Sequence, residues 1–582
     1  MGVRVGVAAA LLALAGAPHA AAATFSVSRT DDPAPGACQP GDCSLREAVL
    51  AANAGSGGDM IALPAGHFRL TIPGPGEDAG AAGDLDITKN VTITGSGARL
   101  TVIDGQGIDR VFDVAGGVTA EIDDVTVTGG QTPGDGAGIR SGGTLKILRD
   151  TISGNAAGGD GGGIASTGAL SISQSTISGN HATNGGGLEL AGTATVGSST
   201  ISGNAAGGPG SSGSGGGIHG SALSLSSSTL TDNRSFNALL AGGGLDVPVA
   251  HVDNTILASN MSYLVDQSMG ALSNCAGPVS SGGHNLSDGT DCGLHQAGDH
   301  ESASIVLGPL TDNGGATDTE ALPAGGLAID AGAGCTAADQ RGVSRPRGSA
   351  CDVGAYEYAP PLATTTAATS VGFSAATLTG MLDPSMRETT AWFEYGTTTQ
   401  YGSTTPVRIV GSGNGQASFT EPLAGLRQGV TYHYRLIAAN SEGRTVGADQ
   451  FFTTLDRTKP SLTVMRIVPG LFHRKNGAQL AFRLSENATV TFRFDHVLRG
   501  VRRGKRCVKI TRRNRRSRPC TRYLPVSGSV VQSGAEGPNS IHWDARVGTK
   551  LLTFGAYRLR ATPRDRAGNV GKTVLAAFRV LR

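Results

Sequence analysis

Between Val125 and Asn260 the apolar positions of the chain return with a fixed stride. One apolar anchor follows a threonine in each TISGN-like phrase, and successive anchors are 25, 25, 24, 29 and 26 residues apart. These anchors are Val127, Ile152, Ile177, Ile201, Leu230 and Ile256. A second apolar series keeps the same stride after the glycine-rich runs, at Ile139, Ile164, Leu188, Ile218 and Leu245. An internal period of about 25 residues is typical of a solenoid.

Each copy contains three short pieces with alternating residues, for example 151–153, 163–165 and 170–172. Isoleucine and leucine lie on one side of these pieces, and threonine, serine and charged residues lie on the other, which predicts half-buried strands. One coil cannot bury its own apolar side, whereas stacked coils can pair equivalent strands in parallel and pack isoleucine on isoleucine. The repeats therefore predict an all-β parallel β-helix, and the crossover rule predicts that it is right-handed.

An asparagine follows the anchor by three residues in four copies, at Asn155, Asn180, Asn204 and Asn233. Asparagine tolerates left-handed backbone at a corner, and its amide can bond to the asparagine of the next coil. We therefore expect a structural ladder of stacked asparagine side chains. Asn260 follows Ile256 by four residues, so the spacing predicts a looser register in the last copy.

The phrase CSLREAVLAAN at residues 43–53 differs from the repeats and predicts a short helix. Ser44 and Glu47 have the spacing of a capping box, and the apolar residues of the phrase share one face. A β-helix has an open apolar end that can recruit another chain, so we expect this helix to cover that end.

Residues 1–23 have the pattern of a secretory signal peptide, with Arg4, an apolar run over 5–14 and small residues near Ala22 and Ala23. They predict a secreted, extracellular protein that could be associated with the cell wall, and no other stretch is apolar enough to span a bilayer.

The eight cysteines fall into four close pairs, which in an exported chain favour disulfides over a metal site. The predicted bridges are Cys38–Cys43, Cys275–Cys292, Cys335–Cys351 and Cys507–Cys520.

Two groups of phrases resemble a known family. CSLREAVLAAN at 43–53 looks like the CSLREA-type N-terminal segment of secreted bacterial β-helix proteins, and GGGI with TISGN resembles repeats of the polymorphic outer-membrane-protein type. Residues 307–358, with the phrases DQRG and CDVGAYEY, are similar to the choice-of-anchor Q segment that follows such helices. The resemblance covers residues 38–358 and implies a capped β-helix over 24–358. It transfers no catalytic residue, because the family has no agreed ones.

The composition changes at residues 359–363, which predicts a linker. Residues 364–455 carry strand-like phrases and resemble a fibronectin type III module, with Trp392 expected in an early core strand. Residues 456–582 again alternate strands and turns and resemble an immunoglobulin-like module. The sequence thus predicts two β-sandwich domains after the solenoid, and we interpret the first of them as a spacer.

The last predicted domain contains a concentrated run of positive charge. Residues 499–522 hold twelve Lys or Arg and no acid, whereas the whole chain has a net charge of +1, so the rest of the chain stands at −11. Such a field attracts polyanions at low salt, and outside a cell these include wall polymers and acidic polysaccharides. Nucleic acid is disfavoured because no aromatic residues are interleaved to stack on bases. A merely solvated hairpin is the alternative interpretation. The predicted binding residues are Arg502, Arg503, Lys505, Arg506, Lys509, Arg512, Arg513, Arg515, Arg516 and Arg518.

Parallel β-helices often carry pectate lyase or polygalacturonase chemistry, so an enzyme has to be weighed. Residues 151–240 hold only three acids, which is sparse for a groove that cleaves sugars. Glu189, His219 and Asp246 each stand one residue after a second-series anchor, on the outer face of three successive coils. Rungs are about 4.8 Å apart, so His219 could share protons with either acid. These three are the candidate catalytic residues, although outward polar residues on a solvated strand would give the same pattern.

A second outward series stands four residues before the second anchors. It contains Asp135 and Asp160, followed by Asn184 and Ser214, and such a line of oxygens suits calcium. We expect no resident cofactor, with calcium at Asp135 and Asp160 as the alternative.

These features favour a secreted, monomeric, non-catalytic surface or extracellular-matrix protein that binds glycans or anionic cell-wall polymers. The alternative is a polysaccharide lyase or glycoside hydrolase of the β-helix type that acts on an acidic polysaccharide. The sequence leans away from an enzyme and names no substrate.

Overall fold

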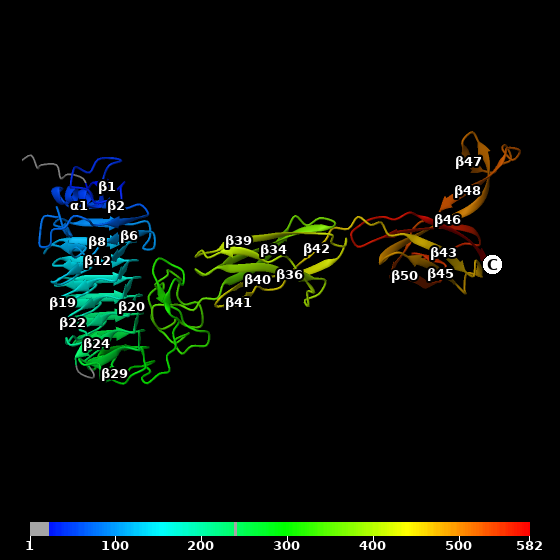
Figure 1. Ribbon diagram of the computed structural model, residues 1–582. Coiled ribbons are helices and arrows are strands. Elements are labelled where there is room, and N and C mark those ends of the chain that lie inside the picture. Colours follow the sequence, from blue (N-terminus) through cyan, green and yellow to red (C-terminus); the bar gives the residue numbers. More distant parts are fainter. Residues whose placement is uncertain (1–21, 238–240) are drawn as a thin grey trace, which may run out of the picture.

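The computed structural model describes residues 22–237 and 241–582. In this part of the chain nearly every element is a strand, and the one helix is α1 (Leu45–Ala54). Figure 1 shows a stack of strands, coloured blue to green, followed by two antiparallel units, coloured green to red. The parallel β-solenoid predicted from the repeats is confirmed and has about seven turns. The signal peptide expected at 1–23 lies outside the described residues, apart from its last two.

Three sheets form the walls of the solenoid, and all their pairs are parallel except β28 with β29. The nine-stranded sheet contains β3 (Gly66–Arg69), β6 (Thr101–Asp104), β9 (Thr126–Thr128), β13 (Thr151–Ser153), β17 (Thr176–Ser178), β20 (Thr200–Ser202), β23 (Thr229–Thr231), β27 (Ile256–Ala258) and β31 (Leu286–Ser287). The seven-stranded sheet contains β10 (Gln131–Thr132), β14 (Ala156–Ala157), β18 (His181–Ala182), β21 (Ala205–Ala206), β24 (Arg234–Asn237), β28 (Met261–Leu264) and β29 (Gly270–Leu272). The fifteen-stranded sheet contains β1 (Thr24–Ser26), β2 (Asp59–Ala62), β4 (Leu85–Ile87), β5 (Val91–Thr94), β7 (Phe112–Val114), β8 (Thr119–Asp123), β11 (Ile139–Ser141), β12 (Thr144–Leu148), β15 (Ile164–Ser166), β16 (Leu170–Ser173), β19 (Leu188–Gly197), β22 (Ile218–Ser226), β25 (Leu245–Asp246), β26 (Val249–Asp253) and β30 (Ser280–Gly283).

The anchors stack on one another inside the nine-stranded sheet. Ile152 pairs with the anchors of both neighbouring coils, and its side chain is fully buried. The last copy corrects the predicted register, because Leu230 pairs with Leu257 and not with Ile256. Asn260 therefore follows its anchor by three residues, as in the other copies, and the expected loosening was wrong. Ile256 packs instead in a separate core with Tyr356.

The predicted asparagine ladder is confirmed and continues beyond the predicted residues. The side-chain amide of each asparagine donates to the side-chain oxygen of the next, over 2.9–3.0 Å. The same amide also donates to the backbone carbonyl of an anchor one coil earlier, as from Asn180 to Ile152. These bonds satisfy the polar groups of a buried corner. The ladder runs through Asn155, Asn180, Asn204, Asn233, Asn260 and Asn274.

Helix α1 starts with the predicted capping box. The Glu47 N–H donates to the Ser44 hydroxyl, and the Ser44 N–H donates to the Glu47 carboxylate. The apolar face of α1 joins the solenoid core through Leu45, Ala48 and Val49. As expected from the sequence, the helix packs on the first coils, as Figure 1 shows.

Two polar side chains of α1 fix the loop that precedes β4. Arg46 is 1% exposed, and its guanidinium donates to the carbonyls of Gly80, Gly83 and Asp84 over 2.8–3.0 Å. The Asn53 amide donates to the carbonyl of Asp86 at 2.6 Å. The helix therefore positions residues 80–88 as well as covering the core.

Residues 307–358 pack along the outside of the nine-stranded sheet. Gln340 exchanges hydrogen bonds with the hydroxyls of Thr176 and Thr200, and Glu320 accepts from two more hydroxyls of the same sheet. Several threonine and serine side chains that the alternation placed opposite the core are consequently buried. The regular elements described in this segment are two short strands, β32 (Leu310–Thr311) and β33 (Thr319–Glu320).

The same segment also docks on the first antiparallel unit. Arg341 is buried 2.8 Å from Asp339 and stacks 3.6 Å from the centre of the Tyr356 ring. From the other side, Arg387 donates to the Tyr356 hydroxyl at 2.6 Å and to Glu442 at 2.9 Å. A buried ionic and aromatic cluster thus joins the solenoid segment to the next unit.

The stretch expected as a linker, 359–363, takes part in this contact. Ala359 is fully buried, and its N–H donates to the Glu442 carboxylate. The first strand of the next unit already begins at Leu362.

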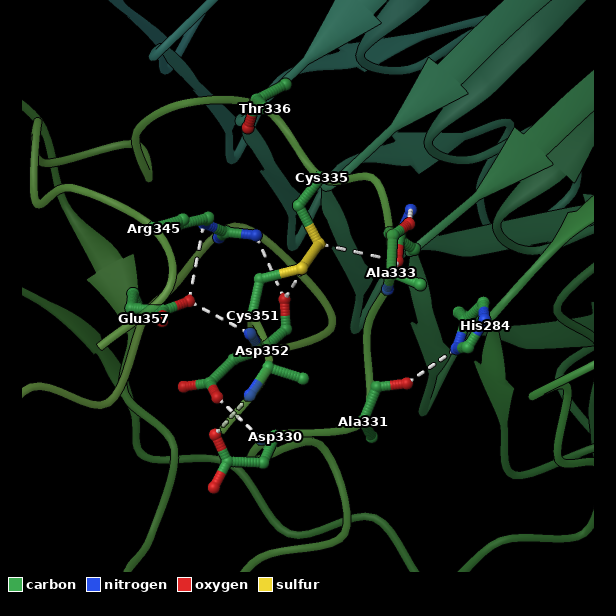
Figure 2. Close-up of a disulfide and its surroundings, with 12 residues drawn as sticks. His284, Asp330, Ala331, Ala333, Cys335, Thr336, Arg345, Cys351, Asp352 and Glu357 are labelled. Atoms are coloured by element: carbon green, nitrogen blue, oxygen red, sulfur yellow. Dashed lines mark hydrogen bonds and ion pairs between the residues drawn. A yellow bond between two sulfur atoms is a disulfide. The ribbon is translucent and has the colours of Figure 1, made fainter. Parts of the chain in front are cut away.

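All four predicted disulfides are confirmed. Figure 2 shows the Cys335–Cys351 bridge, which lies within residues 307–358 where this segment packs against the solenoid. Next to it, Arg345 donates to the carbonyl of Asp352 at 2.9 Å, and His284 bonds to the carbonyl of Ala331 at 2.7 Å. The bridge therefore holds a segment that has few strands of its own.

The first antiparallel unit encloses a core between two sheets. Phe393 and Tyr434 are fully buried there. Trp392 lies in β36, a strand that contributes Ala391 and Phe393 to this core, and its own side chain is half-buried beside Arg444. One sheet contains β34 (Leu362–Thr369), β35 (Ala375–Asp383) and β39 (Ala417–Ala424). The other contains β36 (Thr389–Gly396), β37 (Ser403–Thr404), β38 (Arg408–Gly411), β40 (Thr431–Asn440), β41 (Gly443–Val446) and β42 (Gln450–Thr453).

The second antiparallel unit has an aromatic core around Phe494, Trp543 and Phe578. Its smaller sheets contain β43 (Leu462–Val468), β45 (Ala478–Leu484) and β50 (Gly537–Trp543), and β51 (Arg546–Val547) with β52 (Lys550–Leu551). Its larger sheet contains β44 (Leu471–His473), β46 (Ala488–Arg503), β47 (Arg506–Lys509), β48 (Pro519–Pro525), β49 (Val530–Gly534), β53 (Gly555–Arg564) and β54 (Val574–Leu581).

Candidate functional site

The basic residues 499–522, called here the basic hairpin, extend a strand of the second antiparallel unit. The first part of β46 pairs with β53 and β49 over the core, and Phe492 and Phe494 are fully buried there. The last part pairs with β47 and β48 instead. Figure 1 shows β47 and β48, in orange, projecting beyond the rest of the unit. The packed half of one strand therefore sets the direction of the hairpin.

The ten predicted binding side chains are all exposed. In the part of the chain that the structure describes, no carboxylate lies within ion-pair distance of them. Asn514 shapes the outer loop, because it accepts from the Thr511 N–H and donates to the carbonyl of Lys509. The Cys507–Cys520 bridge joins β47 to β48 with a Cα separation of 6.0 Å. The hairpin is thus a closed loop with uncompensated positive charge.

The structure brings Glu189, His219 and Asp246 into register on β19, β22 and β25. The His219 Nδ1 atom lies 2.7 Å from the Glu189 carboxylate, so the predicted proximity of these two is correct. This hydrogen bond is the main cause that raises the pKa of His219 above its ordinary value of 6.5, with the charge of Asp246 adding to it. Asp246 lines a cavity of about 300 Å³ next to Val247. Near neutral pH the arrangement can hold a proton between an imidazole and a carboxylate.

Glu189→Gln is expected to lower the pKa of His219, because the strongest group that stabilises the imidazolium is removed while burial still favours the neutral ring. Asp246→Asn is expected to lower it less, since Asp246 acts only through its charge. NMR titration of the His219 ring measures both shifts. Equal pKa values in the wild type and Glu189→Gln would contradict the assigned hydrogen bond.

The side chains of Asp135 and Asp160 each accept a hydrogen bond from a backbone N–H group of the next coil. Asp135 accepts a hydrogen bond from the Asp160 N–H, and Asp160 accepts from the Asn184 N–H and side-chain amide. Asn184 in turn accepts from the Ser214 N–H. This geometry favours a structural ladder over the calcium alternative at these two residues.

The outward line that contains Glu189 is longer than the sequence analysis recognised. Each residue of the line pairs in register with the residue of the next coil on the fifteen-stranded sheet. The full line is Asp86, Asp113, Arg140, Ala165, Glu189, His219 and Asp246. A step of 27 residues from Asp86 to Asp113, repeated to Arg140, was the available signal. The less regular stride of the first coils obscured it.

Two groups of three acids in the described chain bring carboxylate oxygens within 4.8 Å of one another, and neither was predicted from the sequence. One group is Asp84, Asp86 and Asp113 in the first coils, and all three are buried. The other is Asp456, Glu486 and Asp565, at the junction of the two antiparallel units. Asp113 is far from Asp84 and Asp86 along the chain, and Asp456, Glu486 and Asp565 are far from one another, so neither group forms a complete motif in the sequence.

No protein-family model matches the chain, and no curated protein sequence matches it. Among solved structures it is similar to the sensor domain of the anti-sigma factor RsgI4 from Pseudobacteroides cellulosolvens, with a TM-score of 0.14 and 15% identity over 17% of this chain and 96% of that chain. It is also similar to the FN1–FN3 domains of chicken CNTN1, with a TM-score of 0.18 and 11% identity over 38% of this chain and 67% of that chain. These values assign neither fold nor function, so the family resemblances remain predictions.

Proposed function

We propose that the protein is an exported, non-catalytic binding protein whose basic hairpin holds an anionic polysaccharide or cell-wall polymer. The observation that carries this proposal is a projecting hairpin with ten exposed basic side chains, none of which pairs with a carboxylate among residues 22–237 and 241–582. Electrostatic attraction of this kind is strong only where positive charge is concentrated and uncompensated.

The charge of the rest of the molecule is unevenly distributed. Residues 1–455 hold 19 Lys or Arg and 40 acids, whereas residues 456–498 and 523–582 hold 16 Lys or Arg and 6 acids. A polyanion is therefore repelled from the solenoid and the first antiparallel unit and attracted to the second unit, where the hairpin concentrates the positive charge. The solenoid and the first antiparallel unit then act as a spacer that carries the hairpin at a distance. Export is supported by four disulfides. The one helix among residues 22–237 and 241–582, α1, lacks the length and apolar character to cross a membrane.

The proposal is tested with the full chain and a variant in which Arg512, Arg513, Arg515 and Arg516 are changed to Ser. An exposed ion pair contributes about 0.2–1 kcal/mol, and tenfold in affinity is about 1.4 kcal/mol. Four such contacts sum to about 0.8–4 kcal/mol, so we expect the variant to bind an acidic polysaccharide about fourfold to several hundredfold more weakly at low salt, with unchanged behaviour on a neutral polymer.

The matched control removes the same charge elsewhere in the same unit. Arg474, Lys475, Arg483 and Arg493 are four of the exposed basic side chains that this unit has outside the hairpin. Changing these four to Ser should leave most of the affinity in place. Equal losses in the two variants would show that net charge, and not the hairpin, governs binding.

A second candidate function rests on the Glu189–His219 hydrogen bond. An imidazolium held by a carboxylate can act as a general acid, and Asp246 stands on the next rung. A β-helix lyase or hydrolase acting on an acidic polysaccharide would use such a group. His219 occupies the rung between the two acids, which leaves no evident place for the water that an inverting hydrolase puts between its carboxylates. Cleavage of an acidic polysaccharide that disappears in His219→Ala would favour this function over the binding proposal.

A further inference from the structure

In the first coils of the solenoid, the outer face of the fifteen-stranded sheet carries three aspartates that are buried instead of solvated. Asp86 on β4 and Asp113 on β7 lie opposite each other in the parallel pair, and Asp84 immediately precedes β4. Their neighbours Leu85 and Ile87 point into the core. An outward aspartate is normally solvated, but here the exposed fractions of Asp84, Asp86 and Asp113 are 1%, 5% and 9%.

These carboxylates are close together and incompletely paired. One oxygen from each lies within 4.8 Å of the others. Arg110 contacts Asp84 Oδ2 at 3.0 Å, and Arg140 contacts Asp113 Oδ2 at 2.8 Å. Asp84 Oδ1 and Asp86 Oδ2 are buried, and no described residue offers either oxygen a hydrogen bond. Leaving two buried carboxylate oxygens unpaired is costly, so their burial points to a group that binds them.

The charges around the cluster indicate the charge of the group that would bind there. Asp109 is 2% exposed, has one unpartnered oxygen and acts electrostatically on Asp84. Four aspartates against the guanidinium groups of Arg110 and Arg140 leave an excess of negative charge, and Glu77 and Asp78 add to it. This excess favours a cation.

We propose that Asp84, Asp86 and Asp113 bind one divalent cation, and that this cation is Ca²⁺. All three ligands are carboxylates, and Ca²⁺ prefers a flexible shell of about six to eight oxygens. The neighbouring carbonyls of Gly80 and Gly83 are already held by Arg46. Arg46 and Asn53 of α1 fix the same loop, so cation binding stabilises the N-terminal cap together with the first coils.

Burial is the main cause that raises the pKa of Asp84 to about 6 and that of Asp86 to about 7. The other charged groups that act on the cluster are Glu77, Asp78, Asp109, Arg110 and Arg140.

The test uses the full chain stripped with chelator, with Ca²⁺ titrated by calorimetry and melting followed in parallel. Asp86→Asn keeps the shape of the side chain and removes one ligand charge, and Asp84→Asn is an independent second variant. Asp565→Asn in the other carboxylate cluster is the matched control. We expect both N-terminal variants to bind one Ca²⁺ fewer than the wild type and to lose the rise in Tm at pH 7.5. Asp565→Asn should retain that binding and that rise.

The proposal is overturned if Asp86→Asn and Asp84→Asn bind Ca²⁺ with the stoichiometry of the wild type. It is also overturned if the wild type binds no Ca²⁺ in the N-terminal cluster. Neither result depends on the basic hairpin, so this test and the polyanion test fail independently.

Discussion

Replacing Ile177 with Asp is expected to destabilise the solenoid by about 3–5 kcal/mol or more, because it places an unpaired charge in the core. Ile177 is fully buried and stacks between Ile152 and Ile201. The change affects both neighbouring rungs, so the Tm of the solenoid transition should fall sharply. Thermal and chemical unfolding followed by circular dichroism measure this effect.

The control for this prediction is Ser171→Asp, on the exposed side of β16. Ser171 pairs in register with Lys146, so the new carboxylate meets solvent and a positive neighbour. A change within about 0.5 kcal/mol is expected. Similar Tm values for the two Asp variants would contradict the assigned register.

Replacing Arg341 with Met is expected to cost about 3–5 kcal/mol, because it removes one partner of a buried ion pair and leaves the other uncompensated. The guanidinium of Arg341 is fully buried, bonds to Asp339 and covers the Tyr356 ring. Tyr356 in turn contacts Arg387 of the next unit. Loss of Arg341 should therefore loosen residues 307–358 and the junction together, which limited proteolysis detects as new cleavage in this segment.

Two further variants separate the ion pair from general surface effects. Arg341→Met combined with Asp339→Asn should recover part of the stability, because the uncompensated charge is also removed. Arg427→Met changes an exposed arginine and should have little effect. Unchanged protease resistance in Arg341→Met would contradict the role of this residue in docking the segment.

Local and repeated features were predictable from the sequence because their physical causes lie within one coil or between equivalent positions. The stride of the anchors gave the parallel stacking, the Ser44–Glu47 spacing gave the capping box, and close cysteine pairs gave the bridges. The last anchor was misassigned because Ile256 and Leu257 are both apolar and both buried. Only the pairing with Leu230 distinguishes them.

Contacts between distant segments were not predictable from the pattern. Gln340 reaches Thr200 across 140 residues, so the cover over the nine-stranded sheet has no periodic signal. The Glu189–His219 pair was found because both residues follow anchors, whereas Asp86 and Asp113 lie in coils with a less regular stride. The burial of Asp84 and Asp86 also depends on a loop held by Arg46, which the sequence analysis treated only as part of a helix.

The most direct test of the proposed function is the salt dependence of binding by the intact protein to an acidic polysaccharide. Exposed charges are screened over about 10 Å at 0.1 M salt and about 3 Å at 1 M. If the basic hairpin holds the polymer, affinity should fall steeply and continuously across this range, and the variant with Arg512, Arg513, Arg515 and Arg516 changed to Ser should show a shallower slope. Affinity that does not change with salt, or equal slopes for the two proteins, would contradict the account.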